Sequence, residues 1–187
     1  MKNRLSNLFI VAAMTISGLV QAQNYNVVAS TSSIIVDGDS NVHKWSIKAT
    51  KIGSSAVVSD SKITGLSLNV AVEGLKSGKD GMDENTYKAL KYKENPSIIF
   101  KLTEPTAVLT ETESDVNLVG NLTIAGTTKK VTIKTKAQLT KSGSLQLKAN
   151  VPLKMTEYKV DPPKAVFGTI KTYDPVLIKA DIDFKKA

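Results

Sequence analysis

Apolar residues recur at every second position over long stretches of this 187-residue chain. In VTIKTKAQLT, residues 131–140, Val131, Ile133 and Leu139 share one face, and lysines alternate with them on the other. The same alternation runs through residues 66–72, 116–124, 145–151 and 176–184. A period of two gives a strand one apolar and one polar face, so the pattern predicts half-buried antiparallel strands.

Turn signals separate these stretches, at Asp37-Gly38, Ala125-Gly126 and Ser142-Gly143. We expect about eight strands, many of them longer than the usual five or six residues. Long strands with one apolar face favour closure into a barrel, because closure removes exposed sheet edges. The sequence thus predicts a single all-β domain, an antiparallel closed barrel.

One segment breaks the period of two. DENTYKALKYKE, residues 83–94, is rich in helix-forming residues, Asp83 stands in an N-cap position, and Pro96 ends any helix before the next strand. We therefore expect one short helix near one end of the barrel.

The N-terminus carries the pattern of a secretory signal peptide. Lys2 and Arg4 form a basic start, an apolar run follows from Leu8 to Val20, and Ala22 ends a small-residue cleavage motif. A transmembrane anchor would need about 18 to 20 apolar residues, more than this run provides. We expect a signal peptide over residues 1–22, cleavage after Ala22, and an exported domain over residues 23–187, periplasmic or secreted.

The composition restricts the partners. The chain has 25 basic and 17 acidic side chains, a net charge of +8, and its lysines alternate with apolar residues instead of clustering. Aromatic residues make up 5% of the chain, too few for a base-stacking surface, so we expect no nucleic-acid partner. A transient contact with an anionic membrane surface stays open, and the sequence does not predict an oligomeric state.

No motif for catalysis, metal or cofactor binding is found. With one histidine and no cysteine, a histidine or thiolate zinc site and a cysteine nucleophile are not expected. No G-x-S-x-G motif presents a serine. DGDSNVHKW resembles a calcium loop at Asp37, but Val42 and Lys48 replace its essential glycine and glutamate. We expect a protein without catalysis, metal or cofactor.

SNVHKWS, residues 40–46, holds the only histidine and the only tryptophan. Side chains two apart on a strand share a face, so we expect His43 beside Trp45 and Ile47. His43 then packs at a strand start, contacts the polar head of a ligand, or catalyses; the first interpretation is the most common for a lone histidine.

A barrel of about eight strands is either filled by side chains or holds one small ligand. Small inward residues such as Ala137, Ala149 and Ala180 could leave room for a thin apolar chain. A filled barrel would instead serve as a structural or interaction module of the cell envelope. If a ligand is held, the alternation predicts these contacts: His43, Trp45, Ile47, Leu68, Val70, Phe100, Leu118, Leu122, Ile133, Leu147, Ile178 and Ile182, with Phe167 either gating the mouth or anchoring its loop.

Four segments together resemble the YceI-like family, in particular its secreted Bacteroidetes-type branch. They are SNVHKWS, MDENTYKALKYKENPSIIFKLT, GNLTIAGTTKKVTIKTK and PPKAVFGTIKTYDPVLIKADIDF, which lie between Tyr25 and Phe184. The resemblance implies a lipocalin-like barrel that holds a polyisoprenoid or another long apolar lipid in a central tunnel, with the helix near one end. It also implies a periplasmic or secreted protein without catalysis.

Overall fold

The computed structural model of the protein describes residues 22–165 and 167–187. The expected signal peptide lies, apart from Ala22, outside the described residues. Between them, the described residues form one α-helix, α1 (Asp80–Ala89), two 3-10 turns, η1 (Val72–Gly74) and η2 (Met155–Tyr158), and twelve strands. The strands are β1 (Gln23–Val27), β2 (Ser33–Ser40), β3 (Trp45–Ala49), β4 (Ile52–Ser59), β5 (Lys62–Ala71), β6 (Leu75–Lys76), β7 (Ser97–Leu102), β8 (Ser114–Ile124), β9 (Thr127–Leu139), β10 (Leu145–Lys154), β11 (Lys164–Ala165) and β12 (Ile170–Lys186).

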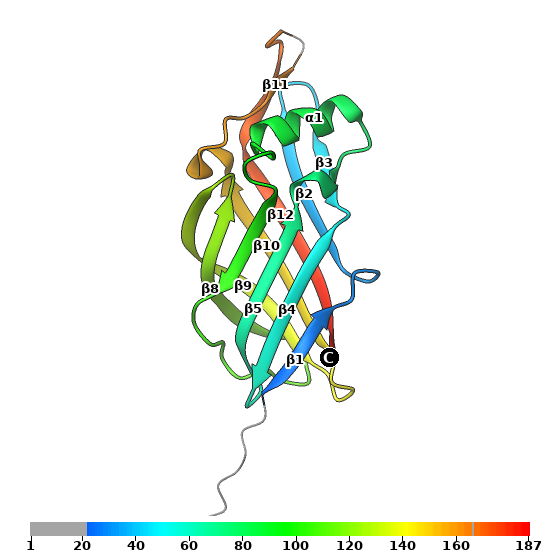
Figure 1. Ribbon diagram of the computed structural model, residues 1–187, viewed down its shortest axis with the longest axis vertical. Coiled ribbons are helices and arrows are strands. Elements are labelled where there is room, and N and C mark those ends of the chain that lie inside the picture. Colours follow the sequence, from blue (N-terminus) through cyan, green and yellow to red (C-terminus); the bar gives the residue numbers. More distant parts are fainter. Residues whose placement is uncertain (1–21, 166) are drawn as a thin grey trace, which may run out of the picture.

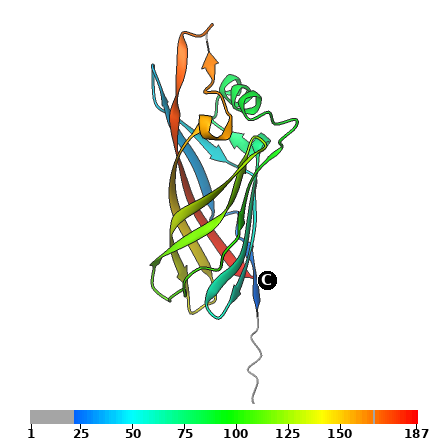
Figure 2. The same ribbon diagram turned by 90° about the vertical axis from the view of Figure 1, so that its left-hand side faces the viewer.

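Eight strands close into a barrel, which confirms the expected fold. Each strand pairs antiparallel with the next in the order β1, β4, β5, β7, β8, β9, β10, β12, and β12 pairs back onto β1. The long β12 also pairs with β2, which continues the wall through β3 and β6 toward α1. Figures 1 and 2 show an elongated barrel with α1 and β11 at one end and β1 and the C-terminus at the other. We call these the α1 end and the β1 end.

The apolar face that the alternation predicts for the strands points into the barrel. In β8 the side chains of Val116, Leu118, Leu122 and Ile124 are all buried, and the residues of the other face, Asn117, Val119, Asn121 and Thr123, are more exposed. The expected two-residue turn at Ala125-Gly126 joins β8 to β9 with positive φ angles at both residues. The expected turn at Ser142-Gly143 also joins β9 to β10, but the connection spans residues 140–144, and within it Gly143 alone has a positive φ.

The prediction of a turn at Asp37-Gly38 is wrong, because both residues lie inside β2. Gly38 pairs with Trp45 of β3, and a Cβ on Gly38 would collide with the indole ring. The glycine is therefore required for close packing rather than for a turn. The chain turns at residues 41–44 instead, where the Ser40 hydroxyl accepts hydrogen bonds from the N–H groups of Val42 and His43 and donates one to the His43 carbonyl.

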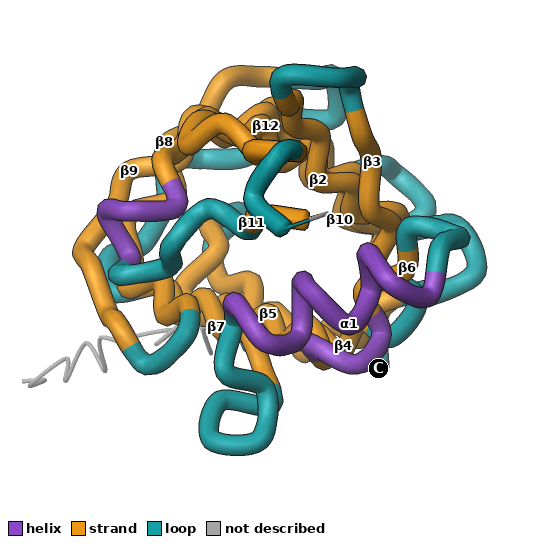
Figure 3. Tube along the Cα trace, turned by 90° about the horizontal axis from the view of Figure 1, so that it is seen from above, coloured by secondary structure: helices purple, strands orange, loops and turns teal. Residues whose placement is uncertain are grey.

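The barrel is filled toward the β1 end. Tyr25, Ile63, Leu145 and Phe184 have exposures of at most 1% there and close that end. Farther along, Phe100 lies against Gly120, where a Cβ would meet its ring at 2.6 Å. Seen along the barrel, α1 spans one side of the opening at the α1 end, and β11 with its connecting loop reaches over the other (Figure 3). In the part of the chain that is described, no helix is both long and apolar enough to cross a membrane.

Candidate functional site: an apolar cavity beneath the helix

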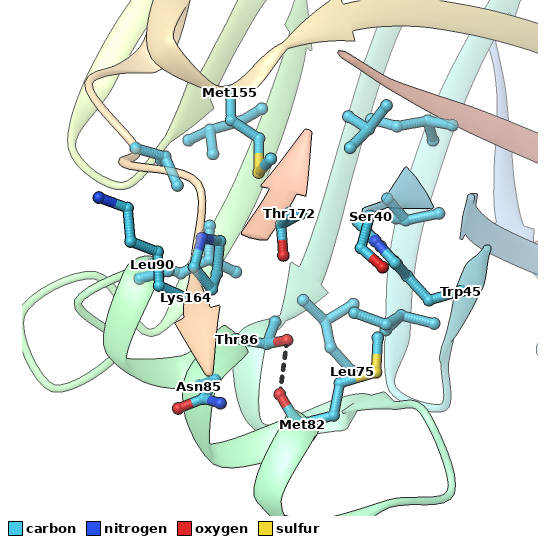
Figure 4. A pocket seen from close by; sticks show the side chains of 18 of the residues that line it. Ser40, Trp45, Leu75, Met82, Asn85, Thr86, Leu90, Met155, Lys164 and Thr172 are labelled. Carbon is cyan, nitrogen blue, oxygen red and sulfur yellow. Dashed lines mark hydrogen bonds between the residues drawn. The ribbon is translucent and has the colours of Figure 1, made fainter. Parts of the chain in front are cut away.

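A cavity of about 400 Å³ occupies the barrel at the α1 end. Its wall comes from β2, β3, β6, β7, β8, β10 and β12, and its cover comes from α1, η2 and β11 (Figure 4). Most of its lining is apolar: Val36, Trp45, Ile47, Leu75, Met82, Ala89, Leu90, Ile98, Ile124, Leu153, Met155, Val160, Ile170, Val176 and Ile178. A concave apolar space of this size is typical of a site for a small ligand.

Trp45 forms a fixed part of the cavity wall. Its ring lies over Gly38 on the neighbouring strand, and its indole Nε1 donates a hydrogen bond to the Asp39 carbonyl at 3.1 Å. This bond satisfies the one polar atom of the side chain and leaves the rest of the ring available to an apolar ligand. The only tryptophan of the chain is thus a natural reporter of the cavity.

His43 lies at the rim of the cavity and not on a strand face beside Trp45, because β3 begins only at Trp45. Its side chain is exposed, and its Nδ1 lies 3.0 Å from the carbonyl oxygen of Lys44. The Ser40 hydroxyl holds the loop, as described above. His43 is therefore placed where the cavity meets solvent.

A buried carboxylate fixes α1 over the cavity. Asp83 is 4% exposed and accepts hydrogen bonds from the N–H and the hydroxyl of Ser77, at 2.7 and 2.6 Å, with Lys76 Nζ at 3.5 Å. Burial alone would raise the pKa of Asp83, but the Ser77 hydrogen bonds and the Lys76 charge outweigh it and lower the pKa below its usual value.

The N-cap role expected for Asp83 is wrong. The helix begins at Asp80 with Lys79 as N-cap, so Asp83 lies within the first turns and its carboxylate bonds to the preceding segment. Tyr87 adds a second anchor, since its hydroxyl donates to the carbonyls of Glu73 or Leu75 at 2.9 and 3.1 Å. Both contacts hold the apolar face of α1 down on the barrel.

Three uncharged polar side chains on the lining have no hydrogen-bond partner within the described chain: Asn85 of α1, Tyr158 of η2 and Thr172 of β12. The Thr86 hydroxyl, by contrast, is bonded to the Met82 carbonyl at 2.9 Å (Figure 4). Tyr158 is 2% exposed, and its burial raises the pKa of its hydroxyl. These groups could hydrogen-bond a polar end of a ligand.

The described part of the lining contains no acidic side chain, and its cations are Lys79 and Lys164. Neither lysine takes part in an ion pair among the described residues. The described residues also contain no group of three or more His, Cys, Asp and Glu side chains arranged to hold a metal ion. The site is thus an apolar space with a weakly basic rim.

The residues expected to contact a ligand fall into three groups. His43, Trp45, Ile47 and Ile178 line the cavity, whereas Phe167 is fully exposed at the turn between β11 and β12. The others lie in the packed core or against it, outside the lining: Leu68, Val70, Phe100, Leu118, Leu122, Ile133, Leu147 and Ile182.

Sequence reasoning missed the contribution of the helix. Met82, Thr86, Ala89 and Leu90 line the cavity, and their spacing of four, three and one residues is that of one helix face. This helical spacing is present in the sequence, but the alternation of period two in the strands does not reveal it.

A closed antiparallel barrel of eight strands that encloses an apolar cavity is a lipocalin-like fold. The chain belongs to the YceI-like family: the pattern of the YceI-like domain matches residues 25–184. No curated protein sequence matches the chain.

Solved structures of related proteins share the fold. A polyisoprenoid binding domain from Saccharophagus degradans, implicated in plant cell wall breakdown, aligns with a TM-score of 0.69 at 10% identity over 87% of this chain and 98% of its own. BcnA of Burkholderia cenocepacia gives 0.66 at 14% identity, over 84% and 98%. The Campylobacter jejuni YCEI protein gives 0.51 at 14% identity, over 100% and 99%. At these identities the likeness concerns the fold alone.

Proposed function

We propose that the protein binds a long apolar lipid of the polyisoprenoid type, with part of the lipid chain in the cavity at the α1 end, and that it does so without catalysis. The observation that carries this proposal is the apolar cavity of about 400 Å³ beneath α1. Membership of the YceI-like family and the fold shared with a polyisoprenoid binding domain support it. The predominance of apolar side chains on the lining favours binding over chemistry.

The cavity limits how much of the lipid is enclosed. A water molecule takes about 30 Å³ in the liquid and a methylene is of similar size, so the cavity accommodates about a dozen methylene groups. Burying them contributes on the order of 10 kcal/mol, from which ordering and immobilisation subtract several. A longer lipid therefore projects through the opening beside α1, where Asn85 and Thr172 are available to its polar groups.

Native mass spectrometry of the protein, produced from its full chain and purified without detergent, tests this proposal. We expect an adduct that disappears on organic extraction, and the extract then identifies the lipid. Ala89→Phe, which places a ring in the cavity from α1, should carry no adduct. If the wild type carries none and neither polyisoprenoids nor fatty acids bind when added, the proposal fails.

We also propose that the protein works outside the cytoplasm, in the periplasm or as a secreted protein. The basic start, the apolar run and the small residues before Gln23 support this proposal. N-terminal sequencing of the protein recovered from the cell envelope or the medium should begin at Gln23. Recovery only from the cytoplasm with Met1 at its start would refute it.

A further inference from the structure

The described chain exposes few large apolar side chains, and most of them lie at the α1 end. Phe167 is exposed to 110% of its reference area, Val42 to 61% and Tyr173 to 49%. Tyr92, which follows α1, is exposed to 38%. Only Val108, at 54%, lies near the β1 end, where its neighbour Leu109 bonds to the turn between β4 and β5. Exposed apolar side chains that gather on one part of a surface indicate an interaction site.

Two segments that carry these side chains form one projection beside the cavity. The turn between β11 and β12 holds Phe167, and the loop between β2 and β3 holds Val42. Asn41 joins them: its Nδ2 donates to the Thr169 carbonyl at 2.9 Å, and its Oδ1 accepts from the Lys171 N–H at 2.8 Å. Figures 1 and 2 show that β11 and the start of β12 rise beyond α1. We call residues 40–44, 163–165 and 167–173 the mouth projection.

The mouth projection is basic. It contains Lys44, Lys164 and Lys171 and no acidic residue. Lys164 and Lys171 are directly paired across β11 and β12, and none of the three lysines forms an ion pair within the described chain. Three cations without partners beside exposed apolar side chains complement a surface that is both anionic and apolar.

Phe167 also has an unfavourable backbone conformation. Its φ is +53°, in the left-handed region that a bulky residue rarely adopts, and its side chain gains no packing in return. The packing of the barrel does not explain why an aromatic residue occupies this turn. A binding partner that buries the ring explains the aromatic residue at this position.

We propose that the mouth projection docks on an anionic lipid bilayer, with Phe167 and Val42 in the interfacial layer and the lysines at the lipid head groups. Pro163, Lys164, Ile170 and Thr172 belong both to the projection and to the lining of the cavity. Docking therefore brings the cavity against the bilayer. If the proposed lipid-binding function holds, a chain passes between bilayer and cavity without crossing bulk water.

Flotation with vesicles tests the docking, with protein produced from the full chain. Vesicles of phosphatidylcholine are compared with an equal mixture of phosphatidylcholine and phosphatidylglycerol. We expect binding to the mixed vesicles that weakens with added salt. Phe167→Ser should weaken it about tenfold through the lost apolar contact. Replacing Lys164 and Lys171 together by Gln should weaken it at least tenfold, at about fivefold per lysine.

Matched variants at the β1 end serve as controls. Val108→Ser removes an exposed apolar side chain, and Lys62→Gln with Lys185→Gln removes two lysines that form no ion pair in the described chain. We expect both to bind the mixed vesicles within about twofold of the wild type, since neither alters the docking surface. Any contribution of residues 1–22 is common to all variants. Equal losses at both ends, no effect of Phe167→Ser, or no vesicle binding by the wild type would overturn the proposal.

A second readout separates docking from lipid binding. We expect a brominated fatty acid in the cavity to quench Trp45 in the absence of vesicles, and Phe167→Ser should leave this quenching unchanged because its side chain is outside the lining. Docking without quenching in the wild type would refute the proposed function and leave the docking intact. Quenching without docking would do the reverse.

Discussion

Two leucines on β10 allow a direct test of the division of the barrel into a filled and a hollow part. Leu147 and Leu153 share the inward face of one strand. Leu147 is 4% exposed and pairs with Ala137 and Ile182 in the filled part. Leu153 pairs with Val176, is only partly buried and lines the cavity. The two positions have the same residue type, strand and orientation but different surroundings.

The expected costs follow from those surroundings. Leu→Ala removes three carbons, about 2.4 kcal/mol at about 0.8 kcal/mol per buried methylene. At position 147 a new void adds to this loss, so we expect about 3 to 4 kcal/mol of destabilisation. Leu153 already borders empty space and loses fewer contacts, so we expect about 1 to 2 kcal/mol there.

Urea unfolding followed by Trp45 fluorescence measures both costs. With an m-value of about 2 kcal/mol/M, the midpoint should fall by about 1.5 to 2 M for Leu147→Ala and by about 0.5 to 1 M for Leu153→Ala. Binding of a brominated lipid should show the opposite order, about fivefold weaker for Leu153→Ala and nearly unchanged for Leu147→Ala. Equal unfolding midpoints for the two variants, or equal effects on lipid binding, would refute the assigned position of the cavity.

Three further predictions use the same assays. Gly38→Ala should lower the free energy of unfolding by about 1 to 3 kcal/mol, because the added Cβ collides with Trp45, whereas Gly53→Ala, which has room for a Cβ, should be neutral or slightly stabilising. The pKa of Asp83 is lowered on folding, so the stability that its carboxylate contributes is present above pH 3.8 and is lost as the pH falls through the folded pKa. Asp83→Asn should thus be less stable than the wild type near neutrality and lose less of its remaining stability on acidification. Urea midpoints measured across pH test this. Asn85→Leu should weaken binding of a lipid with a hydroxyl or carbonyl head about fivefold and leave a plain hydrocarbon chain unaffected, by quenching titration; equal losses for both ligands would assign Asn85 a role in helix placement only.

The sequence predicts the barrel well because its main determinant is local. Alternation in β8 and β9 identifies which side chains point inward, and the turns at Gly126 and Gly143 require the positive φ that glycine supplies. The position of the short helix also follows from a local change of period. Pairing of β1 with β12 then closes the barrel, so that neither strand is left as an exposed sheet edge.

The residues of the candidate site are harder to predict from the sequence, because whether an inward side chain lines the cavity depends on its position along the barrel axis. Leu147 and Leu153 follow the same pattern, yet only Leu153 reaches the cavity. Tertiary contacts also override local rules. Asp83 is a residue type that often caps helices, but here its carboxylate bonds to Ser77. Gly38 follows an aspartate, a pair typical of turns, but here the glycine makes room for the Trp45 ring.

Quenching of Trp45 by a lipid brominated midway along its chain tests the central claim most directly, because the only tryptophan lies on the cavity wall. We predict quenching that saturates at one lipid per protein and is lost in Ala89→Phe. A lipid that binds without quenching Trp45, or that quenches Ala89→Phe as strongly as the wild type, would contradict the claim that the cavity beneath α1 holds the chain.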